Sequence, residues 1–204
     1  MLYAACLRIR ERNQMDQGAR ILAVVGSPRK GGNTDILVDN IIAGARKCKA
    51  HVDKFRLQGM DIRPCTACDR CRKHSDDPCV IKDDMTQKIH PILRAADAVI
   101  IGTPIYFFTM SAQTKLFMDR CYALGGPQGS RLKGKKVAVA MAYAGEDALD
   151  SGALNAYRAF QDTFNWVGAE FVGMVHGHGE AKGDIAKNKK LLAAAKELGR
   201  QLCR

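Results

Sequence analysis

The chain has 204 residues, 47% of them hydrophobic, which is enough for one sizeable core and fits one domain better than two. No apolar run approaches the roughly 20 residues that a membrane-spanning helix needs, so we expect no membrane association. The formal net charge of +11 would suit a nucleic-acid-binding protein, but Lys and Arg are spread along the chain without a basic stripe interleaved with aromatic residues. We therefore expect no nucleic-acid partner.

The N-terminal segment and the cysteines indicate in which cellular compartment the protein is expected. Residues 1–19 are typical of an appended arm. Their short apolar stretch is followed by basic residues, whereas a secretory signal would have a cleavage site of small residues there. Eight cysteines in a chain of this length without such a signal are more typical of metal binding or redox chemistry than of a disulfide framework. We expect a cytoplasmic protein whose folded domain spans residues 20–204.

Apolar, β-rich runs alternate with helical patterns along that domain. The runs predict five strands, at residues 21–26, 52–57, 97–102, 136–142 and 171–175. A helix is expected from Asn33 to Lys47, with Asn33 or Thr34 able to cap its start. Further helices are expected from Asp83 or Asp84, where Gln87 can complete a capping box from Asp84, and from near Ser111, Ser151 and Asp184.

This alternation predicts an α/β fold with a doubly wound, parallel sheet, because right-handed crossovers place helices on both faces of such a sheet. Five strands match the flavodoxin-like order 2-1-3-4-5 better than the larger six-stranded dinucleotide-binding fold. We expect a three-layer sandwich with a five-stranded parallel sheet at its centre.

The turn after the first strand carries the groups that bind a phosphate. Residues 26–34, GSPRKGGNT, supply glycines such as Gly32 where backbone must approach a ligand, together with the side chains of Ser27, Arg29, Asn33 and Thr34. Free N–H groups at the start of the following helix favour an anion. The loop is neither GxxxxGK[ST] nor GxGxxG, which favours a monoester phosphate. The alternative is an ordinary strand-to-helix turn built from small residues.

The loop resembles that of the NAD(P)H-dependent FMN reductases of the flavodoxin-like fold, which reads close to GSxRxxxNT. Residues 102–120, GTPIYFFTMSAQTKLFMDR, resemble the second signature of that family. The resemblance covers roughly residues 20–200. It implies that the cofactor is FMN and that Ser27, Arg29, Asn33 and Thr34 surround its phosphate.

The resemblance also places the flavin ring. The ring is expected along the loop after the third strand, at the switch point of the sheet, where an apolar or aromatic wall and backbone groups are offered by Pro104, Ile105, Tyr106 and Phe107. The alternative is that Tyr106 and Phe107 are core aromatics. A third loop, AYAGED at residues 142–147, is expected to reach the flavin through Ala142 and Gly145.

A cysteine-rich loop spans residues 64–80 and reads PCTACDRCRKHSDDPCV. Its cysteines have the spacing C-x2-C-x2-C-x7-C and are Cys65, Cys68, Cys71 and Cys79. The first three match the ferredoxin-type run, whereas the fourth lies farther away and has no Pro after it. The arrangement resembles the iron–sulfur flavoproteins, a branch of the same family, and implies a [4Fe-4S] cluster. Zinc and free or regulatory thiols are the alternatives.

These features predict an FMN-binding oxidoreductase of the iron–sulfur flavoprotein kind, which transfers electrons between FMN and the cluster. One alternative is an NAD(P)H-dependent FMN or quinone reductase without a cluster, and another is a non-enzymatic electron carrier of the flavodoxin type. We assign no catalytic side chain, because the protein contributes binding and orientation to flavin chemistry. The expected partner is a small-molecule or protein redox partner, with NAD(P)H as a possible electron donor. The resemblance further implies a homodimer or homotetramer.

Overall fold

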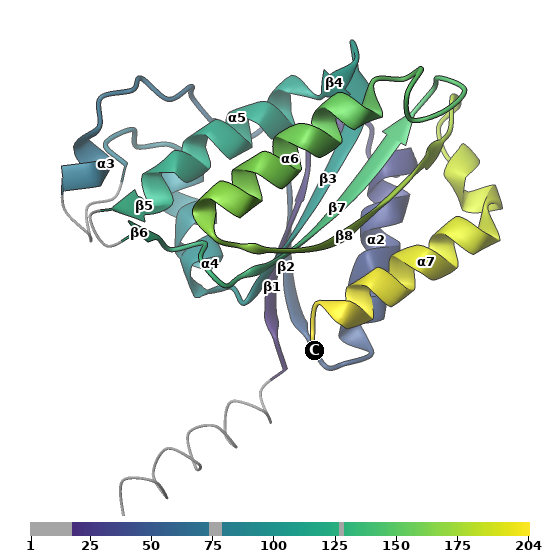
Figure 1. Cartoon of the computed structure of the whole chain (residues 1–204), viewed down its shortest axis with the longest axis horizontal. Coiled ribbons are helices and arrows are strands. Elements are labelled where there is room, and N and C mark those ends of the chain that lie inside the picture. The colour runs from purple at the N-terminus through teal and green to yellow at the C-terminus, as the bar shows by residue number, and fades with distance from the viewer. Residues whose placement is uncertain (1–17, 74–78, 127–128) are drawn as a thin grey trace, which may run out of the picture.

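The computed structural model describes residues 18–73, 79–126 and 129–204 (Figure 1). The predicted arm over residues 1–19 lies outside these ranges except for Gly18 and Ala19. In the part of the chain that is described, no helix is long and apolar enough to cross a membrane.

A parallel sheet forms the centre of the domain. Its strands run in the order β2-β1-β3-β7-β8, every neighbouring pair along this path is parallel, and this confirms the predicted order 2-1-3-4-5. The bounds are β1 (Arg20–Val25), β2 (His51–Arg56), β3 (Ala98–Tyr106), β7 (Lys136–Tyr143) and β8 (Glu170–His178). β1 and β7 are buried nearly throughout, as expected of central strands that are covered on both faces.

Helices cover both faces of the sheet (Figure 1). One face packs against α2 (Asn33–Arg46) and α7 (Lys189–Gln201), and the other against α4 (His90–Ala95), α5 (Ala112–Arg120) and α6 (Ala153–Val167). Successive side chains of β1 point to opposite faces, so Ile21 and Val25 join the core under α2 while Leu22 and Val24 join the core under α5 and α6.

Short elements connect this frame. They are α3 (Arg70–Lys73), a π-helical turn η1 (Met85–Ile89), the 3₁₀ turns η2 (Cys121–Leu124) and η3 (Asp184–Lys187), β4 (Thr109–Met110), and the small hairpin of β5 (Gly125–Gly126) and β6 (Gly129–Ser130). α3 and η2 belong to the cysteine-rich region described below.

The helix starts differ from the sequence prediction at two places. Neither Asn33 nor Thr34 caps α2, because Gly32 occupies the cap position and no side chain caps the helix. The capping box expected from Asp84 and Gln87 is formed one residue earlier, where the backbone N–H of Asp83 donates to Thr86 Oγ1 at 3.0 Å and the N–H of Thr86 donates to Asp83 Oδ1 at 3.2 Å.

Two other helix starts follow the prediction more closely. Ser111 caps α5 as expected and accepts a hydrogen bond from the N–H of Thr114 at 3.3 Å. The helical segment from Asp184 begins as the turn η3, and Asn188 then caps α7 by accepting from the N–H of Leu191 at 3.0 Å. Side-chain caps therefore fix both starts.

The third strand is longer than predicted. The expected loop at residues 104–107 lies within β3 as far as Tyr106, because the strand continues beyond its parallel partners and pairs antiparallel with β4, Ile105 with Met110 and Tyr106 with Thr109. Phe107 and Phe108 form the two-residue turn, with φ of 48° and 67°. Positive φ at both central positions is the geometry of a tight hairpin turn, and it projects this hairpin beyond the end of the sheet.

Candidate functional site

The turn after β1 is fastened to the neighbouring strand and helix. The N–H of Gly26 donates to the carbonyl of Gly102 at 2.8 Å, and Ser111 Oγ donates to the carbonyl of Gly26 at 2.9 Å. A Cβ at Gly26 would lie 1.9 Å from Thr114 Oγ1, so only glycine fits there. The start of the phosphate loop is thus held between β3 and α5.

The same turn presents free backbone donors. Within the described residues, the N–H groups of Asn33, Thr34 and Asp35 make no hydrogen bond, since no side chain caps α2 and the loop carbonyls bond elsewhere. Ser27 is buried, and its Oγ accepts from the N–H of Arg29 at 3.2 Å, whereas Arg29 itself is exposed. Free N–H groups at the start of a helix, beside a hydroxyl and a guanidinium, fit a phosphate.

Asp35, which the sequence analysis did not single out, organises the charge beneath this loop. Its carboxylate accepts from the N–H of Gly31 at 2.7 Å, from Lys54 Nζ at 2.7 Å and from Arg56 Nη2 at 2.6 Å. Burial alone would raise the pKa of Asp35, but these hydrogen bonds outweigh it and hold the pKa at about 2. Lys54 and Arg56 are two positions apart on β2, so both side chains point to the face of the sheet that α2 covers. This spacing is the sequence signal that could have indicated the ion pairs with Asp35.

Asn33 binds a distant loop through its side chain. Its Nδ2 donates to the carbonyls of Gly179 at 2.8 Å and Ala181 at 2.9 Å, and its Oδ1 accepts from the N–H groups of Gly183 at 2.9 Å and Ile185 at 3.2 Å. These four bonds use the whole hydrogen-bonding capacity of the amide. The group that Asn33 can still offer a ligand is therefore its backbone N–H.

The loop held by Asn33 brings a cation to the predicted phosphate loop. A Cβ at Gly31 would lie 3.9 Å from Cε of Lys182, so the lysine side chain lies over the glycine turn. Lys182 is exposed, and its ammonium has no hydrogen-bond or ion-pair partner among the residues that the structure describes. Lys182 is far in sequence from the loop it faces: its neighbour Ala181 is already 148 residues from Asn33. No local sequence pattern would have found this lysine.

The predicted flavin wall is the hairpin of β3 and β4. Pro104 is buried and Ile105 half-buried, whereas Tyr106, Phe107 and Phe108 are 42%, 97% and 59% exposed, so none of the three is a core aromatic. The two phenyl rings meet edge to face with 6.2 Å between centroids. An exposed aromatic surface beside a phosphate loop suits a planar ring system.

The third predicted loop follows β7. Ala142 is buried inside the strand, and Gly145 lies beyond it with its carbonyl 2.9 Å from Nδ1 of His178. Tyr143 Oη lies 3.0 Å from Nδ1 of His176, and burial raises the pKa of this tyrosine. The loops after β1, β3 and β7 thus meet at the carboxyl edge of the sheet, where open α/β sheets bind ligands (Figure 1).

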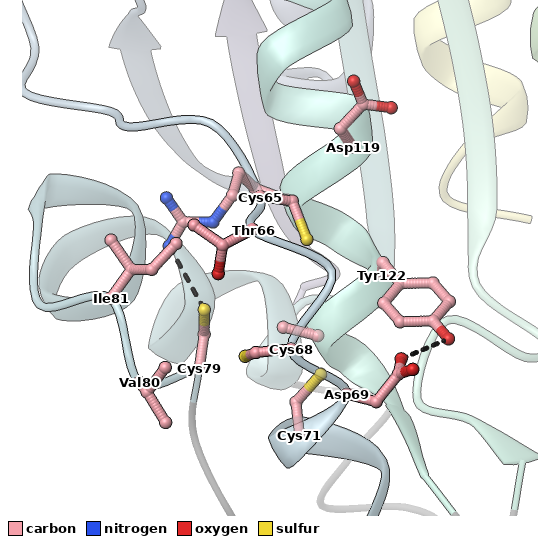
Figure 2. Close-up of a pocket in the computed structure, with 12 residues that line it drawn as sticks. Cys65, Thr66, Cys68, Asp69, Cys71, Cys79, Val80, Ile81, Asp119 and Tyr122 are labelled. Atoms are coloured by element: carbon pink, nitrogen blue, oxygen red, sulfur yellow. Dashed lines mark hydrogen bonds between the residues drawn. The ribbon is translucent and has the colours of Figure 1, made fainter.

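The four cysteines of the predicted metal site line one pocket, together with residues from the end of α5 and from η2 (Figure 2). Cys71 is buried, Cys79 half-buried, and Cys65 and Cys68 exposed. Hydrogen bonds from the N–H of Arg70 and from the Thr66 hydroxyl lower the pKa of Cys68, whereas burial and the neighbouring cysteines raise that of Cys71. The sequence motif therefore does bring its four thiols to one place.

A buried ion pair supports this pocket. Arg120 Nη1 donates to Asp83 Oδ2 at 2.5 Å and to the carbonyl of Arg63 at 2.6 Å, and Nη2 lies 3.5 Å from the sulfur of Cys79. Burial opposes the charge on Asp83, but the hydrogen bonds from Arg120 and from the N–H groups of Arg63 and Thr86 hold its pKa at about 2. The pair joins both ends of the cysteine-rich loop to α5.

The donor chemistry of the pocket fits a thiolate-bound metal, but its present shape does not. No three His, Cys, Asp or Glu side chains among the described residues, which exclude 74–78, are grouped to hold a metal ion. The pocket has about 10 Å³ of free space, roughly the room of one water molecule. The side chains around the pocket would have to rearrange to bind a cluster.

The cysteine pocket and the loops predicted to bind the flavin lie at opposite ends of α5. The helix begins next to the β3–β4 hairpin, and Asp119 and Arg120 at its other end line the pocket (Figure 1). Nine residues of helix span roughly 13 Å. The two candidate sites are therefore separate in the fold.

Comparison with known proteins decides the family. The sequence profile of the NADPH-dependent FMN reductases matches residues 19–178, which is most of the chain. This chain belongs to the NADPH-dependent FMN reductase family. The predicted phosphate loop and the β3–β4 hairpin both fall within the matched part, and the predicted family is confirmed.

Two relatives illustrate the branches of this family. The putative NAD(P)H-dependent FMN-containing oxidoreductase YwqN of Bacillus subtilis is 31% identical over 184 residues, covering 88% of this chain and 96% of that protein. An iron–sulfur flavoprotein of Archaeoglobus fulgidus is 33% identical over 128 residues, covering 62% of this chain. The chain spans 55% of the length of that iron–sulfur flavoprotein.

Solved structures support the fold. The Trp repressor binding protein of Bacillus subtilis has a TM-score of 0.64 with 29% identity, covering 87% of this chain and 99% of that one. The NAD(P)H:quinone oxidoreductase of Methanothermobacter marburgensis has a TM-score of 0.70 with 18% identity, covering 92% of this chain and 97% of that one. The flavodoxin-like fold is thereby confirmed.

Proposed function

We propose that the chain binds FMN at the carboxyl edge of its sheet and acts as an NAD(P)H-dependent oxidoreductase. The observation that carries the proposal is the group of three free N–H donors at the start of α2, which lies beside the exposed aromatic hairpin of β3 and β4. Membership of the NADPH-dependent FMN reductase family supports the same assignment.

The residues have distinct parts in this proposal. Ser27, Arg29 and the backbone N–H groups of Asn33 and Thr34 hold the phosphate, with Gly32 giving the backbone its approach. Pro104, Ile105, Tyr106 and Phe107 form the wall for the flavin ring, and Ala142 and Gly145 border it from the third loop. FMN held by these residues would supply the capacity to accept a hydride from NAD(P)H and to pass its electrons to an acceptor.

Titration with FMN and with riboflavin, followed by flavin fluorescence, tests the binding part of the proposal. We expect FMN to bind at least tenfold more tightly, because riboflavin lacks the phosphate. Gly26→Ala places a methyl group 1.9 Å from Thr114 Oγ1 and is expected to abolish this preference. Equal affinity of the natural protein for the two flavins would contradict the phosphate assignment.

For the cysteine-rich loop we propose a [4Fe-4S] cluster on Cys65, Cys68, Cys71 and Cys79, which makes the protein an iron–sulfur flavoprotein. The convergence of four thiols on one pocket and the names of several relatives support it. The side chains around the pocket must rearrange to admit the cluster, since the pocket has only about 10 Å³ of free space. The separation of the sites predicts that FMN binding does not depend on these thiols.

Iron and acid-labile sulfide measured after anaerobic purification test the cluster. We expect about four of each per chain, loss of both in Cys65→Ser, and their retention in Cys48→Ser, whose thiol lies outside the pocket. FMN binding is expected to survive in both variants. Zinc alone, or no metal, in the natural protein would instead favour a reductase without a cluster.

A non-enzymatic electron carrier is distinguished by turnover. We expect the protein to oxidise NADH or NADPH continuously in the presence of FMN and a quinone, which a carrier would not do. We also propose a homodimer or homotetramer, because the aromatic hairpin that walls the flavin is left exposed in a single chain. Light scattering in solution would show a single chain if this is wrong.

A further inference from the structure

The helices α2 and α7 pack backbone against backbone. A Cβ at Gly44 would lie 1.9 Å from the carbonyl oxygen of Lys196, and one at Gly199 would lie 1.9 Å from that of Ile41. Glycine at both positions is therefore what lets the helices approach so closely. Figure 1 shows the C-terminus of the chain beside the end of α2.

Two cysteines lie one helical turn beyond these glycines. Cys48 follows Gly44 by four residues and Cys203 follows Gly199 by four, so each lies in the turn directly after its helix, next to the place where the helices meet. Both reach the same carbonyl, since the N–H of Cys48 donates to Ala45 O at 2.9 Å and Cys203 Sγ lies 3.6 Å from it. Neither side chain is fully buried.

The two thiols also act on each other. Burial and the neighbouring Cys48 thiol raise the pKa of Cys203 to about 11. A disulfide needs Cα atoms within roughly 7 Å of each other, and close packing of the helix backbones one turn earlier favours that separation. Nothing in the proposed flavin or cluster chemistry uses these two residues.

We propose that Cys48 and Cys203 are a peroxide-sensitive pair that closes into a disulfide and ties the C-terminal turn covalently to the end of α2. The Cys48 thiolate attacks hydrogen peroxide, so an S–O bond forms, the O–O bond breaks, and the departing hydroxide takes a proton to become water. The sulfur of Cys203 then attacks the resulting sulfenic acid, forming the S–S bond and releasing a second water. Two thiols are oxidised and one peroxide is reduced to two waters.

The test compares thermal unfolding of the full-length protein before and after hydrogen peroxide. We expect the Tm to rise by about 10 °C, because the bond closes a long loop in the unfolded chain, and the rise to be reversed by dithiothreitol. Cys48→Ser and Cys203→Ser should each lose the rise. The control Cys121→Ser, whose thiol lies on η2 away from the pair, should keep it.

Mapping of disulfide-linked peptides without reduction gives a second readout. A peptide pair that joins Cys48 to Cys203 is expected in the treated protein and absent from both single variants. Full alkylation of these two cysteines after peroxide would overturn the proposal, as would a Tm rise that persists in Cys48→Ser. Both results are independent of whether the protein binds FMN.

Discussion

The carboxylate of Asp83 accepts hydrogen bonds from both terminal nitrogens of Arg120, at 2.5 and 3.2 Å, and neither side chain is exposed to solvent. Asp83→Asn is expected to destabilise the fold by about 3–5 kcal/mol, because it leaves a buried guanidinium without its counter-ion. Urea unfolding measures the change. Asp162→Asn, which removes the partner of Arg158 in an exposed ion pair, is the control and is expected to have little effect. Equal stability of the two variants would contradict the structural role that we assign to the ion pair of Asp83 and Arg120.

Two buried carboxylates predict how stability depends on pH. Asp35 and Asp83 both have a pKa of about 2 in the folded protein, below the ordinary 3.8. Because the folded-state pKa is the lower one, each carboxylate stabilises the fold fully above about pH 4, and this contribution is lost as the pH falls through 2. Each is expected to contribute about 2 kcal/mol. Urea unfolding from pH 5 to pH 2 should show a decline that is smaller in Asp35→Asn, and a flat profile in the natural protein would contradict it.

Asn33 connects the phosphate loop to a loop that follows β8. Asn33→Ala is expected to free residues 179–185, so their amide hydrogens exchange at least tenfold faster, and to weaken FMN binding as Lys182 leaves the site. Asn40→Ala is the matched control in the same helix, because Asn40 makes a single bond to the carbonyl of Ile36. Unchanged exchange in Asn33→Ala would show that the loop is held by other contacts.

The sequence predicted the sheet because β1, β3, β7 and β8 contain apolar runs of the right length. β2 (HVDKFR) is mostly polar and was the weaker signal. The phosphate loop stays a prediction, based on the glycine and hydroxyl residues that follow β1 directly. Sequence reading failed at the β3–β4 hairpin. Nothing local indicates that two successive phenylalanines adopt positive φ, a conformation that bulky side chains avoid. Pairing with β4 extends the strand and imposes that turn.

Long-range polar contacts were equally hidden from sequence reading. Asn33 and Gly179 are 146 residues apart, and Arg120 and Asp83 are 37 apart. Asn33 was predicted either to cap α2 or to contact the phosphate. Both are local roles, which the polar side chain of Asn and its place at the start of a helix favour. The four hydrogen bonds to the later loop arise only from the packing of α2 against η3.

The turn at Phe107 holds a backbone conformation that bulky side chains avoid. Phe107 is 97% exposed and has a φ of 48°, so Phe107→Gly removes only the edge-to-face contact with Phe108 and relieves the backbone. We expect its free energy of unfolding to be unchanged or about 1 kcal/mol higher, while FMN affinity falls. Thermal unfolding and flavin titration measure the two effects. A variant that loses stability and keeps its FMN affinity would show that the ring serves the fold.

The central claim is that this fold holds FMN where NAD(P)H can reduce it. Anaerobic mixing of the FMN-loaded protein with NADH or NADPH, followed by visible absorption, tests it directly. We predict that the absorption of oxidised flavin bleaches with one equivalent of nucleotide and returns when a quinone is added. A flavin that stays oxidised with both nucleotides, in a protein shown to bind FMN, would contradict the account.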